Sequence, residues 1–298
     1  MTPGPAPRTH APAPTPPAPA WTERALVRDG VRLVLRDWGG EGRPFVLLHG
    51  LAGHVGEWDA LARRLRADGH RVVALDQRGH GASERHPADV SRAAYVADVL
   101  AVLDELGLRN AVLVGQSYGG HAALLAAAHL ATAHGPSHLS GAVLVEAGPA
   151  GITPRTVADV GDWLRAWPVP FPTREAAVAH LGGGPVGEGW ADGLEERDGG
   201  LWPRFDPEVM VASLTEDAGR SWWEEWAAIG VPVLSVVGQH GFVERAEYEE
   251  MARLLPALRG VCLPGAGHDL HLERPEVLHR LVTEFLAGTP CPGVDSKA

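Results

Sequence analysis

Short apolar runs alternate with longer amphipathic stretches along most of this chain. Residues 31–38 alternate between apolar and polar positions, which is typical of a strand with one buried face. Six later runs are short and mainly apolar, and they cover residues 45–48, 72–75, 111–114, 142–145, 233–237 and 260–263. Continuous apolar runs of this length suit strands that are buried on both faces of a parallel sheet.

Helices are predicted between these strands, at about residues 57–67, 95–106, 118–133, 244–255 and 275–287. Alternating strands and helices predict an open α/β sheet with helices on both sides. In such sheets a ligand lies at the carboxyl ends of the strands. The residues that directly follow each apolar run are therefore the first candidates for chemistry.

The segment 152–229 breaks the alternation, because it contains no strand-like run. It holds seven of the ten tryptophans, and its glycine-rich stretch 182–200 predicts a mobile loop. We interpret 152–229 as a helical, tryptophan-rich cap over the strand ends. The cap is inserted into a core formed by residues 21–151 and 230–290.

Composition narrows the class of protein. With 45% hydrophobic and 21% charged residues, the 298-residue chain can bury a large core, whereas the proline- and alanine-rich stretch 1–20 and the last residues, 291–298, are expected to be tails. The net charge of −11 argues against nucleic-acid or membrane binding, and no apolar run reaches the roughly 18 residues of a membrane span. Two cysteines without ligand spacing, and no signal-peptide core, predict a cytoplasmic protein.

The strongest chemical signal is the sequence Gly115-Gln116-Ser117-Tyr118-Gly119, between a predicted strand and an alanine-rich predicted helix. A strand-to-helix turn this tight requires small flanking residues and forces the serine hydroxyl outward, near a helix N-terminus. Ser117 is therefore the candidate nucleophile. The alternative is a glycine-rich turn with an incidental serine.

A second signal is the stretch 49–53, of sequence HGLAG, which directly follows the run 45–48. An oxyanion needs two fixed N–H donors beside the nucleophile. We expect these donors to be the backbone N–H groups of Leu51 and Tyr118. His49 is expected to shape the turn by hydrogen bonding.

A third signal is the stretch 265–269, of sequence GAGHD, which follows the run 260–263. The chain order serine before histidine fits sheet enzymes whose base lies on the last strand-end loop. His268 is therefore the candidate general base, which takes the Ser117 proton and returns it to the leaving group. His271 is a nearby competitor that we expect to face solvent.

Together these segments resemble the α/β-hydrolase superfamily over about residues 25–287. The matching parts are residues 49–50 (HG), 76–83 (DQRGHGAS), 115–120 (GQSYGG) and 267–268 (GH). The resemblance implies an α/β-hydrolase fold: a mostly parallel, eight-stranded sheet flanked by helices, with a helical cap after the sixth strand. It also implies a Ser–His–acid triad without a cofactor, and a structural turn at 76–83 in which His80 could line the site entrance.

The acid of the triad departs from the family pattern. The family usually places an aspartate three residues after the glycine that closes the run 233–237, and this position is Gly241. The alternative place is the end of the preceding strand, where Glu146 stands, and a minority of relatives take their acid from that strand end. We therefore assign the acid to Glu146. Glu244 stays open as the other candidate, and Asp269 is disfavoured because sequence neighbours usually point apart.

Other histidines and acidic clusters give weaker evidence of function. His54 and His121 flank the two oxyanion segments and are expected to be structural. The acidic positions 192, 195, 196 and 198 suggest a cation site only weakly and are expected to be exposed. No spacing in the chain is typical of a metal, nucleotide or dinucleotide site.

The tryptophans of the cap bear on the substrate. Most are expected to fill a small helical core. Trp222, Trp223 and Trp226 cannot all point the same way on a helix, so at least one of them could face the cleft. These three and Trp163 are therefore the candidates for substrate binding. A bulky apolar or aromatic ester, lactone or thioester is expected, whereas strongly anionic substrates are not, because the cap has no cluster of Arg or Lys.

These observations predict a serine hydrolase that cleaves a carboxylic ester or lactone of a small molecule, with no metal and no cofactor. Two alternatives stay open. The same fold and residues also serve C–C bond hydrolysis, lyase and acyl-transfer chemistry, and a hydrolase fold can serve a ligand-binding protein that catalyses nothing. The sequence does not predict the oligomeric state.

Overall fold

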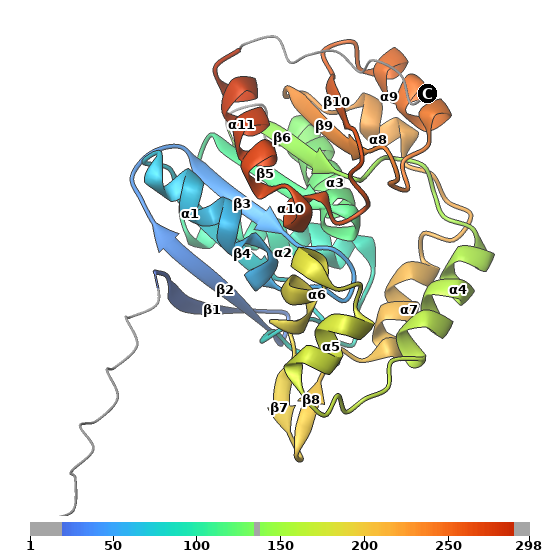
Figure 1. Cartoon of the computed structure of the whole chain (residues 1–298). Coiled ribbons are helices and arrows are strands. Elements are labelled where there is room, and N and C mark those ends of the chain that lie inside the picture. Colours follow the sequence, from blue (N-terminus) through green and yellow to red (C-terminus); the bar gives the residue numbers. More distant parts are fainter. Residues whose placement is uncertain (1–19, 134–137, 289–298) are drawn as a thin grey trace, which may run out of the picture.

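The computed structural model describes residues 20–133 and 138–288. A sheet of eight strands runs through its middle in the order β1-β2-β4-β3-β5-β6-β9-β10 (Figure 1). The first two neighbouring pairs, β1 with β2 and β2 with β4, are antiparallel, and every later pair is parallel. The strands are β1 (Thr22–Arg28), β2 (Val31–Gly39), β3 (Pro44–Leu48), β4 (Arg71–Asp76), β5 (Ala111–Gln116), β6 (Leu139–Val145), β9 (Val233–Gly238) and β10 (Arg259–Leu263).

All seven runs identified as strands lie in this sheet, and the eighth strand, β1, carries no clear sequence signal. Its residues are mostly exposed because it is an edge strand that pairs only with β2. The expected mostly parallel, eight-stranded sheet is confirmed. An edge strand without a buried face has little reason to show an apolar pattern.

Helices cover both faces of the sheet. The side chains of β3 alternate, so Phe45 and Leu47 belong to one apolar core and Val46 and Leu48 to the other. One face packs against α1 (Asp59–Ala67), the short α10 (Leu270–Glu273) and α11 (Pro275–Leu286). The other face packs against α2 (Arg92–Glu105), α3 (Ser117–Ala133), α8 (Trp223–Ala227) and α9 (Arg245–Leu254).

The cap has its own small apolar core and is not purely helical. The expected mobile loop 182–200 is wrong, because it contains α6 and a β-hairpin (Figure 1). Asp198 and Gly199, both with positive φ, form the hairpin turn, and an Asp-Gly pair is the signal that could have revealed it. The cap elements are α4 (Pro154–Arg165), α5 (Arg174–His180), α6 (Gly184–Ala191), β7 (Glu195–Arg197), β8 (Gly200–Trp202) and α7 (Pro207–Thr215).

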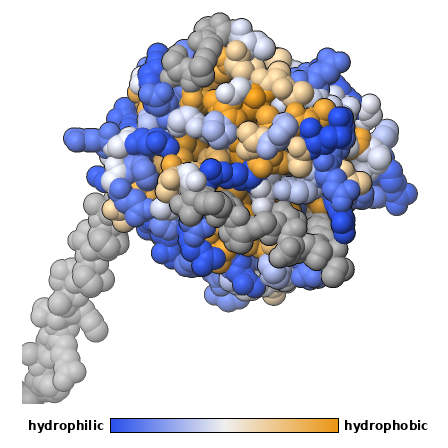
Figure 2. All heavy atoms as spheres, turned by 90° about the horizontal axis from the view of Figure 1, so that it is seen from above, coloured by the Kyte–Doolittle hydropathy of each residue, from blue (hydrophilic) through white to orange (hydrophobic). Residues whose placement is uncertain are grey.

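Figure 2 shows the molecule from the end opposite the β7–β8 hairpin. Apolar side chains gather in the middle of this face, and polar side chains lie mainly round its edge. No helix in the described ranges has both the length and the apolar character needed to cross a membrane.

Candidate active site

Ser117 lies at the sharp turn where β5 ends and α3 begins. Its φ of +50° is unusual for a residue with a side chain and costs of order 1 kcal/mol, so the surrounding packing must enforce it. A Cβ at Gly115 would lie 2.2 Å from the Gly119 carbonyl oxygen, and one at Gly119 would lie 2.3 Å from the His49 carbonyl oxygen. Only glycine therefore fits at the positions two residues before and two residues after Ser117.

The turn at 50–53 lies directly against this elbow. A Cβ at Gly50 would lie 2.2 Å from Gln116 Oε1 and 3.5 Å from Ser117 Cβ. The Gly53 N–H donates to the Gly50 carbonyl, which closes the turn at 3.2 Å. Among the described residues, the N–H groups of Leu51 and Tyr118 have no acceptor. Both are therefore free to donate to a bound oxyanion.

His268 follows β10 on a loop that neighbouring elements hold in place. Gly267 N–H donates to the carboxylate of Glu273, and Gln116 Nε2 donates to the His268 carbonyl at 3.1 Å. Because Gln116 precedes Ser117, this bond ties the His268 loop to the elbow. The Phe242 ring stacks on the imidazole with 4.2 Å between centroids, and 22% of the His268 side chain is exposed.

Glu146 directly follows β6, and its φ of +51° again places a non-glycine residue in the left-handed region. Its carboxylate is buried and accepts hydrogen bonds from the N–H groups of Gly238 at 2.5 Å and Phe242 at 2.6 Å. Its Oε2 lies 3.4 Å from His268 Nδ1. Two backbone donors hold this carboxylate in place beside the imidazole.

The geometry separates Glu146 from the other two acid candidates. A Cβ at Gly241 would lie 2.1 Å from the Glu146 carboxyl atoms, so that carboxylate fills the space beside position 241. Glu244 is exposed and precedes α9 without a contact to His268 among the described residues. Asp269 Oδ2 instead accepts from Trp190 Nε1 of the cap at 3.4 Å.

Ser117 Oγ and His268 share no hydrogen bond in the described structure. In ligand-free hydrolases this contact is often long and tightens when substrate binds. The candidate nucleophile, imidazole, carboxylate and two N–H donors therefore follow the carboxyl ends of β3, β5, β6 and β10 in the same sheet.

His49 is fully buried and hydrogen-bonded, as expected for a residue that shapes the turn. Its Nδ1 lies 2.7 Å from the Gly50 carbonyl, and its Nε2 accepts from Gln77 N–H at 3.0 Å. Burial lowers its pKa to about 3, so the ring is neutral at ordinary pH. This neutral state suits a hydrogen-bonding role in the fold.

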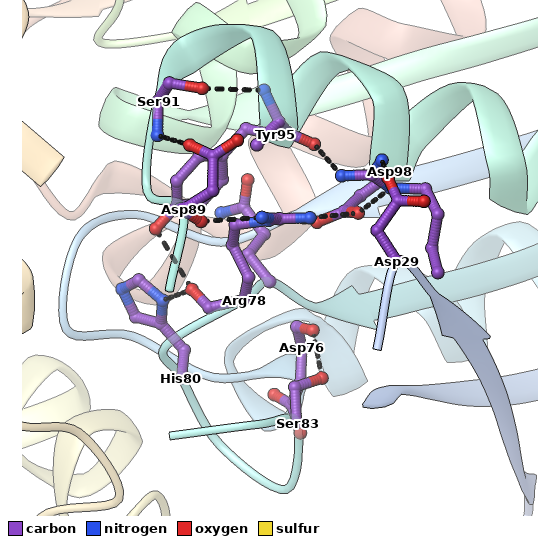
Figure 3. A network of polar contacts seen from close by, with 12 residues as sticks. Asp29, Asp76, Arg78, His80, Ser83, Asp89, Ser91, Tyr95 and Asp98 are labelled. Carbon is purple, nitrogen blue, oxygen red and sulfur yellow. Dashed lines mark hydrogen bonds and ion pairs between the residues drawn. The ribbon is translucent and has the colours of Figure 1, made fainter. Parts of the chain in front are cut away.

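The loop 76–83 is pinned by a buried polar network (Figure 3). The Arg78 guanidinium donates twice to the Asp98 carboxylate, at 2.7 and 2.8 Å, and once to the Asp89 carbonyl. Asp76 accepts from the N–H groups of residues 55 and 82 and so links this loop to the segment after the oxyanion turn. His80 is fully buried, so the expectation that it lines an entrance is wrong.

His271 is the second correction. The expectation that it faces solvent is wrong, because it is 2% exposed and packs on Trp58 with 4.9 Å between ring centroids. Its Nε2 lies 3.3 Å from Oε2 of the buried Glu57, a residue that no sequence motif singles out. Burial raises the pKa of Glu57 to about 8 and lowers that of His271 to about 4.

The candidate tryptophans lie in different environments. The expectation that Trp226 contacts substrate is wrong, because it is fully buried in the main core and donates to the Met251 carbonyl at 3.0 Å. Trp222 is buried between His121 and Arg220. Trp223 packs on the rim of the main core, and Trp163 is 46% exposed on α4.

His54 and two of the four acidic positions of the cap have structural partners. His54 Nε2 contacts the Gly189 carbonyl of the cap at 2.9 Å, which fits its expected structural role. Asp192 pairs with Arg174, and Glu195 pairs with Arg85, so these acidic positions are engaged in ion pairs. In the described ranges, no three His, Cys, Asp or Glu side chains are arranged to hold a metal ion.

Comparisons with known proteins agree with this architecture. The chain is 28% identical over 263 residues to the sn-1-specific diacylglycerol lipase ABHD11 of Mus musculus. The aligned region covers 81% of this chain and 80% of that protein. It is 29% identical to the putative 2-succinyl-6-hydroxy-2,4-cyclohexadiene-1-carboxylate synthase of Bacillus subtilis, over 89% of this chain and 98% of that protein. The crystal structure of E-2-(acetamidomethylene)succinate hydrolase superposes with a TM-score of 0.80 and 24% identity, covering 90% of this chain and 99% of that one.

The sequence model of the alpha/beta hydrolase family matches residues 45–281, which include the elbow, the oxyanion turn and the His268 loop. The sheet order, the two helical layers and the capped strand ends are those of the same fold. This chain belongs to the alpha/beta hydrolase family.

Proposed function

We propose that this protein is a cytoplasmic serine hydrolase that cleaves a carboxylic ester or lactone of a fairly bulky, apolar small molecule. Ser117 attacks the carbonyl carbon while His268 accepts the hydroxyl proton. Glu146 holds the imidazole in the required orientation and stabilises the imidazolium. The N–H groups of Leu51 and Tyr118 bind the oxyanion.

The acyl-enzyme then forms when His268 returns the proton to the leaving alcohol. Water, activated by the same imidazole, releases the acid and frees Ser117. The observation that carries this proposal is the strained conformation of Ser117, with φ +50° between two glycines that tolerate no side chain. Backbone strain of this kind persists only where the surrounding packing enforces it, and such residues cluster at active sites.

A fluorophosphonate probe tests the proposal directly, because it phosphonylates only an activated serine. We expect intact mass to show one adduct on the wild type and none on Ser117→Ala. The matched control is Ser140→Ala, at a residue whose hydroxyl donates to the Asn110 carbonyl away from the elbow, and it should keep the adduct. A well-folded wild type without an adduct would contradict the proposal and favour a ligand-binding role.

A second candidate is non-hydrolytic chemistry at the same residues. The relative that is named a putative synthase is similar over nearly its whole length, which favours considering this candidate. Hydrolysis in ¹⁸O-labelled water places one labelled oxygen in the released acid, whereas elimination leaves the product unlabelled. Product mass therefore separates the two reactions for any substrate that is turned over.

A further inference from the structure

A narrow pocket lies between the oxyanion turn and the cap. Residues 52–54 form one wall, and the aromatic rings of Trp167, Trp190 and Phe205 form much of the rest. The three rings pack edge to face, with Trp167 5.8 Å from Trp190 and 5.3 Å from Phe205 between centroids. The pocket therefore has an apolar, aromatic lining next to the residues expected to bind the oxyanion.

Two residues that line this pocket carry hydrogen-bond donors without acceptors. Both Trp167 Nε1 and Arg204 Nε are inaccessible to solvent and have no hydrogen-bond partner. A buried donor without an acceptor destabilises the fold, and more so when the group is charged. Two such donors on residues that line one pocket point to a ligand that supplies acceptor oxygens when the pocket opens to admit it.

The positive charge of Arg204 is also unpaired, unlike that of four of the five other arginines in the cap; the fifth, Arg220, lies over the Trp222 ring. Arg155, Arg165, Arg174 and Arg197 each form an ion pair with an acidic side chain. Arg204 forms none with any residue in the described ranges.

We propose that this pocket is a carboxylate subsite, in which Arg204 and Trp167 hold a carboxylate borne by the substrate at a distance from its scissile bond. This inference rests on the proposed function and names its substrate class: an ester or lactone of an apolar or aromatic acid or alcohol that carries one further carboxylate. The carboxylate supplies the acceptors that both N–H groups lack. The aromatic walls contact the carbon skeleton beside it.

The charge and dimensions of the subsite limit what it takes. The pocket has about 10 Å³ of free space, which is room for about one water molecule, so binding of a carboxylate requires the cap residues to move apart. One guanidinium matches one carboxylate in charge and in planar geometry. A phosphate carries more charge than this single cation neutralises, which agrees with the absence of an Arg or Lys cluster in the cap.

Matched substrate pairs test the proposal. Ethyl pentanoate and monoethyl glutarate differ in a carboxylate on the acyl side, and phenyl acetate and 4-acetoxybenzoate differ in one on the leaving-group side. We expect the wild type to prefer the carboxylate member of at least one pair by tenfold or more in kcat/KM. The preference should weaken as salt screens the charge.

Three variants assign the preference to the pocket. Arg204→Met, which is similar in length but uncharged, should reduce the ratio of the two kcat/KM values about tenfold or more, and Arg204→Lys should restore part of it. Trp167→Phe, which keeps an aromatic ring but loses the donor, should reduce the ratio less. The control is Arg155→Met, at an arginine exposed on the outside of α4, and it should leave the ratio unchanged.

A binding measurement separates failure of this proposal from failure of the proposed function. Calorimetry with Ser117→Ala should detect monoethyl glutarate or 4-acetoxybenzoate, and adding Arg204→Met should weaken that binding about tenfold. Esters that are hydrolysed without a carboxylate preference, with the ratio unchanged in Arg204→Met, would overturn the subsite and leave the hydrolase standing. Carboxylate binding without turnover and without a Ser117 adduct would overturn the hydrolase and leave the subsite standing.

Discussion

The histidines of two histidine–glutamate pairs lie three positions apart in the sequence, one in the loop after β10 and the other in α10. The two pairs have similar distances but different surroundings. His268 Nδ1 lies 3.4 Å from Glu146 Oε2, and His271 Nε2 lies 3.3 Å from Glu57 Oε2. The first imidazole is 22% exposed at the strand ends, whereas the second is 1% exposed under Trp58. Proximity of a histidine to a carboxylate is therefore not what defines a reactive pair.

The backbone explains the difference between the two carboxylates. Glu146 accepts from two backbone N–H groups, which hold its carboxylate beside the His268 ring. Glu57 Oε1 has no hydrogen-bond partner, and burial raises the pKa of Glu57 to about 8. With the pKa of His271 lowered to about 4 by burial, the second pair is neutral at ordinary pH.

The largest expected effect comes from replacing the carboxylate of each pair by an amide. Glu146→Gln should lower kcat about 10³- to 10⁴-fold, because the neutral amide neither fixes the imidazole tautomer nor stabilises the imidazolium. The matched variant Glu57→Gln should change kcat at most a few-fold, because Glu57 is already uncharged near neutral pH. Initial rates of ester hydrolysis measure both.

Circular dichroism and thermal unfolding serve as the fold control for both variants. Equal losses of kcat in two well-folded variants would contradict the distinction between the pairs. A near-normal Glu146→Gln alongside an inactive Glu244→Gln would move the acid to Glu244.

The two pairs also mark what the sequence could predict. His268 follows a Gly-x-Gly loop after the last strand and Glu146 follows a buried apolar run, so short-range pattern and chain order locate both. The burial of His271 depends on contacts with η1 (Val55–Trp58), more than 200 positions earlier in the chain, and no local pattern encodes that. The expectation that Trp226 contacts substrate is wrong for a similar reason. Its indole donates to a carbonyl of α9, a contact that no local pattern encodes.

The second effect concerns how stability changes with pH. Between the ordinary glutamate pKa of 4.5 and about 8, folded Glu57 keeps a proton that the unfolded chain releases. The contribution of Glu57 to the wild-type free energy of unfolding should therefore fall by a few kcal/mol as pH rises through this window, and level off above it. Glu57→Gln loses this contribution, so its Tm relative to wild type should rise by several degrees between pH 5 and pH 8.5.

Differential scanning calorimetry across that pH range gives the measurement, with the exposed-residue variant Glu249→Gln as control. A Tm difference that stays flat with pH, or that moves the opposite way, would mean that Glu57 is ionised in the folded protein.

A third test asks whether the position of the acid can be exchanged. The Glu146 carboxylate fills the space beside Gly241, so Gly241→Asp alone should crowd two carboxylates and lower activity. Glu146→Ala removes that group and should cost about as much as Glu146→Gln. Adding Gly241→Asp to Glu146→Ala should then recover at least tenfold in kcat, because the new carboxylate meets the same two backbone donors. A double variant no better than Glu146→Ala would show that only the β6 end can orient His268.

The smallest expected effect concerns Phe242. The buried pair has no exposed aromatic ring of this kind beside it. Its ring is 75% exposed yet stacks on His268, and its N–H donates to Glu146. Phe242→Leu keeps the N–H and removes the aromatic face, which should lower kcat about two- to fivefold, because a cation–π contact at an exposed site is worth about 0.5–1 kcal/mol to the imidazolium. Phe242→Tyr keeps the face and should stay close to wild type. A loss as large as that of Glu146→Gln would mean instead that the side chain, and not only its backbone N–H, keeps the carboxylate in place.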